Sequence, residues 1–498
     1  MAKADEKREG RLVIVSNRLP VVLKKRGGNW NVEPGSGGLI TALVPVLRDR
    51  GGLWIGWPGL TAQQAGTGFE QTLAEASRNT GYRLVSVLLT EQEKEGFYLG
   101  FSNEIVWPLF HDLQLLCNFD PAYWRTYRNV NQKFADAIAA NCRDKDFIWV
   151  HDYHLMIVSR YLRDRGIQAS VAFFLHTPFP PLDVFLKLPW RDQILRGLLS
   201  YGLVGLQTLR DRRNFLQCVE NLVPDAGIEG NGDVVNIQFP ERTVQVGVFP
   251  ISIDFDDFAK RASSRAVERR VKIIQDNLAN RKIALGVDRL DYTKGIPYRL
   301  RSFQNALDRY PDLRGALSLV QIIVPSRENI PRYSELKTEI DQLVGEINGK
   351  YTESGWIPVH YLFRSLTGTE LLAYYRASEI ALITPLKDGM NLVAKEYCAA
   401  TTDDDGILIL SEFAGAAAQM KEDAFLVNPY DIEGVADAIH EACVMNEQEK
   451  RRRMKNLRRG IKEQNIYTWV ESVLRAGMSK ELRKVAVLQD YLPQIVIR

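Results

Sequence analysis

Short apolar runs alternate with amphipathic stretches along almost the whole chain, and this alternation most limits the folds that the sequence can adopt. Strands are predicted for apolar runs at residues 12–16, 146–150, 171–175, 203–207, 283–287, 318–324, 380–384 and 407–410. Helical spacing recurs between them, at residues 120–142, 154–165, 209–222, 255–278, 331–348 and 431–446. Strands and helices in alternation are typical of parallel sheets covered by helices. The sequence therefore predicts an α/β fold.

The number of predicted strands exceeds one comfortable sheet, and 498 residues are too many for one compact core. A short strand that ends at Pro250 precedes a long polar helix, and a second series of strands and helices starts at Lys282. We expect a first domain at residues 1–250 and a second at 251–480, each a doubly wound parallel sheet, with a cleft between them. For the segment 481–498, a return to the first domain stays open.

Composition excludes several classes of protein. Against 64 Lys and Arg stand 61 Asp and Glu, and the net charge of +3 provides no global field for a nucleic acid. The basic run at 450–459 is interpreted as a solvated helix face. Five widely spaced cysteines, mostly within apolar patterns, indicate buried thiols in a reducing compartment and not a disulfide framework. With a polar N-terminus and no apolar run long enough to span a bilayer, we expect a cytoplasmic protein without a membrane partner.

Cations follow two of the predicted strands in the second half of the chain. Arg289 and Lys294 come directly after the strand at 283–287, and Arg327 follows the strand at 318–324. A forked guanidinium and a point charge on one loop suit a diphosphate. Surface ion pairs with Asp288 and Asp291 are the alternative.

Polar residues also follow strands in the first half. His151, Asp152 and His154 follow the strand at 146–150, and His176 follows the strand at 171–175. The spacing of metal-binding helices is missing, so we expect no metal. Hydrogen bonds to a polar ligand at the strand ends are favoured, and histidines satisfied within their own loops remain the alternative.

The stretch PLKDGMNLVAKEY, residues 385–397, places acids and bases where a strand gives way to a helix. Asn391 is predicted to cap this helix, so that Asp388 lies on the loop and Glu396 in the early turns. Ligands of open α/β sheets bind at this edge. Together with the cations above, this predicts a phosphate-rich and hydroxyl-rich ligand.

A set of motifs in order resembles the trehalose-6-phosphate synthase family of glycosyltransferases, over about residues 12 to 480. The set comprises VSNRLP, GSGGL, GLWIGWPG, FSNEIVWPLFH, IWVHDYHL, FFLHTPFP, DRLDYTKG, INGKY and PLKDGMNLVAKEY. The resemblance implies the GT-B architecture of two Rossmann-like domains. It also implies transfer of glucose from UDP-glucose to glucose 6-phosphate with retention of anomeric configuration, without cofactor or metal.

The resemblance also implies roles for individual residues. Those implied for the acceptor are a clamp on the 6-phosphate by Arg18, Tyr98 and Arg327, packing of Trp107 beside the sugar, and hydrogen bonds from sugar hydroxyls to Asp152. For the donor, the resemblance implies a glycine loop at Gly37 and Gly38 and binding of the diphosphate by Arg289 and Lys294. His176 and Asp388 would contact the transferred glucose, and Leu366 would lie near the uridine. The donor-site helix would begin with Leu392, Val393, Ala394, Lys395 and Glu396. Glu396 would bind the ribose. The side chains of Lys387 and Lys395 receive no role of their own, and we expect them to be solvated.

Two alternatives stay open. One is a sister transferase that uses another nucleotide-sugar donor or another sugar-phosphate or polyol-phosphate acceptor. The other is a catalytically silent sugar-phosphate sensor. We also expect a homo-oligomer whose partners are its small-molecule substrates.

Overall fold

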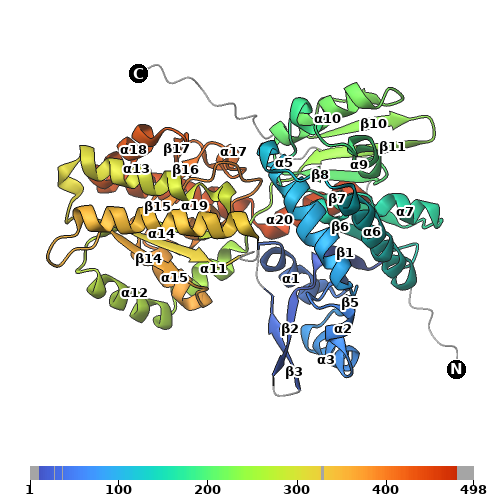
Figure 1. Cartoon of the computed structure of the whole chain (residues 1–498), viewed down its shortest axis with the longest axis horizontal. Coiled ribbons are helices and arrows are strands. Elements are labelled where there is room, and N and C mark those ends of the chain that lie inside the picture. Colours follow the sequence, from blue (N-terminus) through green and yellow to red (C-terminus); the bar gives the residue numbers. More distant parts are fainter. Residues whose placement is uncertain (1–9, 27–28, 36–37, 327–329, 479–498) are drawn as a thin grey trace. The chain divides into compact units, whose positions relative to one another are not determined.

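The computed structural model describes residues 10–26, 29–35, 38–326 and 330–478. The chain divides into two compact units (Figure 1). The first unit comprises the described residues up to Pro250 and those from Trp469 onward, and the second comprises the described residues of Ile251–Thr468. The second domain was expected to end at residue 480. The return to the first unit at Trp469 comes earlier, in the middle of a helix, where the sequence carries no break.

The strands of the first unit form one large sheet. Within the described residues it has nine strands, in the order β5-β4-β1-β6-β7-β8-β11-β10-β9. Its parallel strands are β1 (Leu12–Arg18), β4 (Leu53–Trp57), β5 (Arg83–Ser86), β6 (Phe147–His151), β7 (Ser170–Phe174), β8 (Leu203–Leu206) and β11 (Arg242–Val248). The edge strands β10 (Val234–Phe239) and β9 (Gly227–Glu229) are antiparallel, and a separate hairpin consists of β2 (Val21–Arg26) and β3 (Asn29–Pro34).

The topology of this sheet indicates where a ligand is expected to bind. From β1 the chain runs to β4 and β5 on one side, and then from β6 to β7 and β8 on the other side. Ligands of such sheets bind where the strand order reverses, here at the carboxyl ends of β1 and β6. The run of buried apolar residues in β1 fits a strand covered on both faces.

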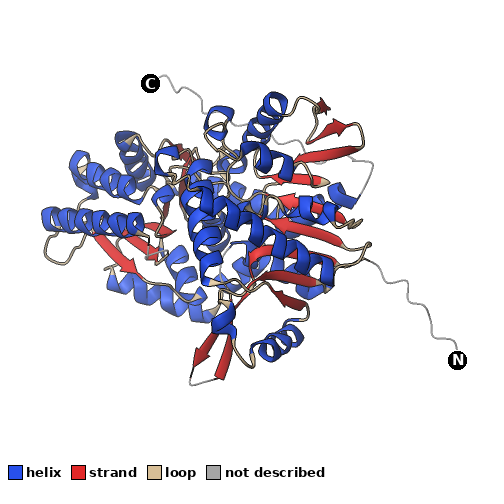
Figure 2. Cartoon of the chain, turned by 45° about the vertical axis from the view of Figure 1, so that its right-hand side comes forward, coloured by secondary structure: helices blue, strands red, loops and turns tan. Residues whose placement is uncertain are grey.

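The helices of the first unit connect these strands (Figure 2). They are α1 (Gly38–Arg50), α2 (Ala62–Ala65), α3 (Phe69–Thr80), α4 (Glu91–Glu93), the π-helix η1 (Lys94–Val106), α5 (Trp107–Phe110), η2 (Gln114–Leu116), α6 (Pro121–Asn141), η3 (Tyr153–Leu155), α7 (Val158–Asp164), α8 (Leu182–Phe185), α9 (Arg191–Leu198), α10 (Leu209–Leu222) and α20 (Ile466–Met478). The end of α20 belongs to this core, because Trp469 packs on Trp149 and Phe174 with ring centroids 4.8 and 5.2 Å apart. Its indole nitrogen also donates to the carbonyl of Phe249 at 3.0 Å.

The second unit contains a parallel sheet with the same kind of reversal. Its strands are β14 (Val359–Phe363), β13 (Leu317–Val324), β12 (Lys282–Arg289), β15 (Ile380–Ile383), β16 (Ile407–Ser411) and β17 (Phe425–Val427), given in their order across the sheet. The chain leaves β12 toward β13 and β14, and then continues from β15 to the other side. The reversal therefore lies between β12 and β15, and the two sheets confirm the predicted α/β class.

The helices of the second unit surround this sheet. They are α11 (Phe255–Ala262), α12 (Arg265–Asn277), η4 (Tyr292–Lys294), α13 (Ile296–Arg309), η5 (Pro311–Leu313), α14 (Pro331–Tyr351), α15 (Gly368–Ala377), α16 (Leu392–Ala400), α17 (Ala417–Met420), α18 (Ile432–Val444) and α19 (Glu447–Glu463). The single helix predicted at 255–278 is wrong, because the chain breaks at Ser263 and starts α12 after Ser264. The basic run lies on α19 with Met454 and Leu457 buried, and most of its cations are exposed as predicted, but Lys450 is only 3% exposed, so the prediction of a solvated face is wrong for this residue.

Two sequence expectations about chemistry outside the site can also be compared with the described residues. Every cysteine there is a free thiol, and two of them, Cys117 and Cys142, are only half-buried. Across the described ranges, the helices are all too short or too polar to traverse a bilayer.

Candidate active site

The loop after β12 is held in shape by its own side chains. The Asp291 carboxylate accepts hydrogen bonds from the backbone N–H and the hydroxyl of Thr293, at 3.0 and 2.9 Å. Gly295 closes the turn at a φ of 65°, and a Cβ there would lie 2.5 Å from the carbonyl oxygen of Thr384. A glycine is therefore needed where α13 begins, and the loop presents Lys294 just before it.

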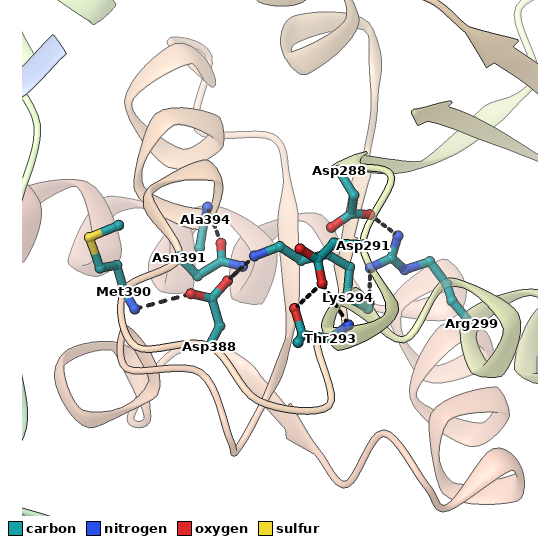
Figure 3. Close-up of polar contacts among 9 residues, drawn as sticks. All are labelled: Asp288, Asp291, Thr293, Lys294, Arg299, Asp388, Met390, Asn391 and Ala394. Atoms are coloured by element: carbon teal, nitrogen blue, oxygen red, sulfur yellow. Dashed lines mark hydrogen bonds and ion pairs between the residues drawn. The ribbon is translucent and has the colours of Figure 1, made fainter. Parts of the chain in front are cut away.

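A buried arginine on α13, Arg299, stabilises this loop (Figure 3). Arg299 is 1% exposed, pairs with the Asp288 carboxylate and donates to the Thr384 hydroxyl at 3.1 Å. It also donates to the backbone carbonyl of Lys294 at 3.4 Å. Sequence reasoning missed Arg299, although a charged residue between Ile296, Leu300 and Phe303 on the apolar face of a helix was the available signal.

These contacts decide between the two interpretations of the cations in this loop. Asp288 is paired with Arg299, and Asp291 folds the turn, so neither carboxylate is shown to pair with Arg289 or Lys294. Arg289 is exposed and forms no ion pair with any residue that the structure describes. The surface-pair alternative is wrong in the described part of the chain.

Lys294 instead pairs with Asp388, another predicted site residue (Figure 3). Its ammonium lies 2.6 Å from the Asp388 carboxylate, and the two side chains are 15% and 11% exposed. The same carboxylate accepts from the backbone N–H of Met390 at 3.1 Å and from the Asn391 amide at 3.3 Å. The pair joins the loops after β12 and β15, at the reversal of strand order in the second sheet.

Asn391 begins α16, as predicted. It adopts a left-handed φ of 63°, and its side-chain oxygen accepts from the backbone N–H of Ala394 at 3.1 Å. Leu392, Val393 and Ala394 follow on the first turn, where backbone N–H groups favour an anion. This helix start therefore lies beside the Lys294–Asp388 pair.

The other residues assigned to the donor are spread over this unit. Glu396 accepts a hydrogen bond from the Tyr375 hydroxyl at 2.9 Å, and burial raises the pKa of its carboxyl group. Leu366 is half-buried in the loop between β14 and α15. Tyr375 was missed in the sequence, because an isolated tyrosine on a helix carries no distinguishing pattern.

The expectation that Lys395 is solvated is wrong. The side chain is 3% exposed, and its ammonium donates to the backbone carbonyl of Ile251 at 2.7 Å and to the amide oxygen of Gln419 at 2.6 Å. Burial lowers its pKa to about 7. Helical spacing buries it, since Cys398 and Ala399, three and four positions further on the same face of α16, are both fully buried.

In the first unit, Arg18 is the last residue of β1 and lies over two aromatic rings. Its guanidinium carbon is 4.4 Å from the centroid of Trp57 and 5.9 Å from that of Tyr98. Gly59 lets the guanidinium approach, because a Cβ there would lie 1.9 Å from a terminal nitrogen of Arg18. No described carboxylate pairs with Arg18, so its charge is available to an anion. Trp57 is a further residue that the sequence did not single out.

Tyr98 and Trp107 come from the π-helix and its end. Tyr98 is half-buried on η1, and Trp107 is 7% exposed at the start of α5, against His111 and Tyr153. The Trp107 backbone N–H donates to the carbonyl of Ser102, five residues earlier. Little of the Trp107 ring is thus exposed to a ligand.

Asp152 lies in the loop after β6 in a left-handed conformation, with a φ of 74°. Its carboxylate accepts from the backbone N–H of His176 at 3.3 Å, and its own N–H donates to the carbonyl of Phe174 at 2.8 Å. β6 adjoins β1, so Asp152 lies at the reversal of strand order in the first sheet. Such a strained residue at a predicted ligand edge is typical of functional sites.

The histidines form a pair. A ring nitrogen of His151 (Nδ1) lies 3.1 Å from a ring nitrogen of His176 (Nε2). Burial lowers the pKa of His176 to about 3 and that of His151 well below its usual value, so both rings are neutral near pH 7. The Nδ1 of His176 is buried without a hydrogen-bond partner among the described residues. This nitrogen is therefore the polar atom of the His176 ring that no described residue engages.

Three of the predicted site residues lie in or next to segments that the structure does not describe. Gly38 begins α1. Gly37 and Arg327 lie outside the described residues. In the part of the chain that the structure describes, the acids, histidines and cysteines form no group that could hold a metal ion.

Comparison with known proteins gives consistent matches over nearly the whole chain. The model of glycosyltransferase family 20 matches residues 10–477. A trehalose-6-phosphate synthase of Mycolicibacterium vanbaalenii is 42% identical over 475 residues, which are 94% of this chain and 96% of the relative.

Solved structures match equally well. An α,α-trehalose-phosphate synthase (UDP-forming) from Burkholderia xenovorans, in complex with glucose 6-phosphate, has a TM-score of 0.85 at 32% identity and covers 94% of this chain and 100% of its own. An E. coli protein bound with UDP-2-fluoro glucose has a TM-score of 0.84 at 34% identity, with coverage of 95% and 100%. This chain is similar to both.

Proposed function

Because this chain belongs to glycosyltransferase family 20, we propose that it transfers glucose from UDP-glucose to glucose 6-phosphate and forms α,α-trehalose 6-phosphate and UDP. The names of its relatives and the ligands of the similar solved structures support this reaction. The contact that carries the proposal is the Lys294–Asp388 pair at the reversal point of the second sheet. It joins a residue assigned to the diphosphate with a residue assigned to the moving sugar.

The donor is assigned to the second unit. Arg289, Lys294 and the N–H groups at the start of α16 offer positive charge to a diphosphate. When the diphosphate engages Lys294, the Asp388 carboxylate accepts hydrogen bonds from glucose hydroxyls in place of this ion pair. Glu396 is assigned to the ribose and Leu366 to the uridine, and the family resemblance also assigns Gly37 and Gly38 to the donor.

Most residues assigned to the acceptor belong to the first unit, and Arg327 falls within the sequence range of the second. Arg18 and Tyr98, together with Arg327, bind the 6-phosphate, and Trp107 packs beside the sugar. Asp152 accepts hydrogen bonds from sugar hydroxyls, and His176 contacts the transferred glucose. The aromatic cradle of Arg18 limits the directions in which its guanidinium can point, so less entropy is lost when a phosphate binds.

The chemistry asks the protein to stabilise a departing diphosphate. Arg289, Lys294 and the dipole of α16 carry out this task in our proposal. The acceptor hydroxyl attacks the anomeric carbon on the face from which UDP leaves, and the departing phosphate takes the hydroxyl proton. Configuration is then retained without a carboxylate nucleophile, and orientation of the two sugars supplies much of the rate.

A coupled assay of UDP release tests the proposal. The purified chain is incubated with UDP-, ADP- or GDP-glucose and with glucose 6-phosphate or glycerol 3-phosphate. We expect trehalose 6-phosphate from UDP-glucose and glucose 6-phosphate. Release with another pair of substrates would show a sister transferase, and binding of sugar phosphates without any release would show a sensor.

We predict that the activity needs no metal ion, because two cations and a helix start serve the diphosphate. Activity measured after dialysis against EDTA should equal that of the untreated enzyme. Loss of activity with EDTA, restored by Mg²⁺ or Mn²⁺, would contradict the prediction.

We further propose a cytoplasmic homo-oligomer. The free thiols of the described chain are compatible with a reducing compartment. Light scattering coupled to gel filtration measures the oligomeric state.

A further inference from the structure

Lys395 is a buried lysine that has no acidic partner among the described residues. Its ammonium is surrounded by the carbonyl oxygen of Ile251 and the amide oxygen of Gln419, and no described carboxylate forms an ion pair with it. Glu422 and Asp423 line the same small cavity, but Asp423 is engaged by Arg452. Burial of an uncompensated charge is costly, and such a group is a candidate for a functional role.

The partners of Lys395 lie at the ends of the second unit. Ile251 is its first residue. The amide nitrogen of Gln419 donates a hydrogen bond to the side chain of Gln464. Gln464 lies four positions before Thr468, the last described residue of this unit. The backbone N–H of Ile466 in turn donates to the carbonyl of Ile253 at 3.0 Å. One hydrogen-bonded cluster therefore fixes both segments through which the chain passes from one unit to the other.

The same lysine belongs to the helix that begins at the candidate donor site. Lys395 is flanked on α16 by Ala394, whose N–H is capped by Asn391, and by Glu396. A shift of this helix on donor binding moves the ammonium, and with it the carbonyl of Ile251. No other described side chain on α16 bonds to a residue of these connecting segments.

We propose that Lys395 is a positioning residue that couples donor binding at α16 to the two connecting segments, and thereby to the affinity of the first unit for the acceptor. The inference rests on the proposed function, because it takes UDP and glucose 6-phosphate as the two ligands. Thermodynamic coupling between two sites is reciprocal and typically amounts to about 5- to 150-fold in affinity.

Calorimetry measures this coupling directly. The dissociation constant of glucose 6-phosphate is determined with and without saturating UDP, for the wild-type chain and for Lys395→Met. We expect UDP to change the wild-type constant by about fivefold or more, and to leave that of Lys395→Met unchanged. UDP affinity itself should stay within about threefold, because the ammonium contacts no donor site.

Two further variants distinguish a loss of coupling from a loss of stability. Gln419→Leu cuts the link to Gln464 but keeps Lys395, and should reduce the coupling. Lys450→Met removes another lysine that is 3% exposed. Lys450 lies on α19 and pairs with Glu447, so this variant should keep the wild-type coupling at whatever stability it retains.

The possible failures are distinguishable. Three results would each overturn the inference. The first is that Lys395→Met keeps the wild-type coupling, and the second is that the wild-type chain shows no coupling. The third is a tenfold loss of UDP affinity in Lys395→Met. A wild-type chain that binds neither UDP nor glucose 6-phosphate would overturn the proposed function instead.

Discussion

At the scale of single residues, the Lys294–Asp388 pair makes opposite predictions for its two members. Asp388 competes with a diphosphate for Lys294, so Asp388→Asn should leave UDP affinity unchanged or raise it. The kcat of Asp388→Asn should fall by about tenfold or more, because the contact of the Asp388 carboxylate with the transferred glucose strengthens in the transition state. Lys294→Met should lose about 10- to 150-fold in UDP affinity, the value of a charge-assisted contact of roughly 1.5–3 kcal/mol. Calorimetry with UDP and steady-state kinetics measure both effects.

Glu396→Gln serves as the comparison for Asp388→Asn. A ribose contact is present in ground state and transition state alike, so this variant should lose UDP affinity with a smaller change in kcat. If Asp388→Asn weakened UDP binding as much as Glu396→Gln did, the division of roles between the two acids would be wrong.

The paired histidines predict how stability depends on pH. Both have lowered pKa values in the folded protein, whereas an unfolded histidine titrates near about 6.5. Below that pH the unfolded chain binds protons that the folded chain does not. The free energy of unfolding should therefore be highest above pH 6.5 and fall toward pH 3, by up to about 1.4 kcal/mol per pH unit for each histidine. Urea unfolding at pH 7.5 and 5.5 measures this slope, and a slope unchanged in His176→Asn would contradict the assignment.

At the scale of elements, α16 depends on an asparagine with two separate functions. Asn391 caps the helix and tolerates a left-handed φ. Asn391→Gly keeps the backbone conformation and should cost less than about 1 kcal/mol. Asn391→Ala loses both and should cost about 2–3 kcal/mol, the sum of a lost cap and a strained residue. Urea unfolding compares the two, and equal costs would show that the conformation of residue 391 is unimportant.

The elements also show how far the sequence could be interpreted. Buried parallel strands such as β13 were predicted within a residue or two, because a short and mostly apolar run rich in β-branched residues is typical of a strand that is covered on both faces. The hairpin of β2 and β3 was missed, since the three consecutive charges at residues 24–26 resemble a loop. The Lys294–Asp388 contact was also beyond the sequence, because the two residues were placed on separate loops and their distance depends on packing. Arg299 was hidden for a related reason, since its partner Thr384 is 85 positions away.

At the scale of the whole molecule, the residues assigned to the diphosphate, the ribose and the uridine lie in one continuous stretch of the described chain. Arg289, Lys294, Leu366 and Glu396 all lie in the second unit, which has its own buried core. We predict that a fragment of residues 251–468 folds alone and binds UDP within about tenfold of the full chain, because it keeps these residues and lacks only Gly37, Gly38 and His176 of the donor set. Calorimetry with UDP and with glucose 6-phosphate tests this. A fragment that is folded by circular dichroism but does not bind UDP would contradict the assignment of the donor to this unit.

The first unit has no such independence, because its core includes Trp469. During synthesis the ribosome completes Pro250 long before it reaches this residue, which lies 219 positions later (469 − 250). At about 5–20 residues per second, the nascent first unit waits roughly 10 to 45 s for its last core side chain. Throughout this interval Trp149 and Phe174 lack the indole that covers them in the finished protein. The apolar surface left open is a natural binding site for a chaperone on the nascent chain.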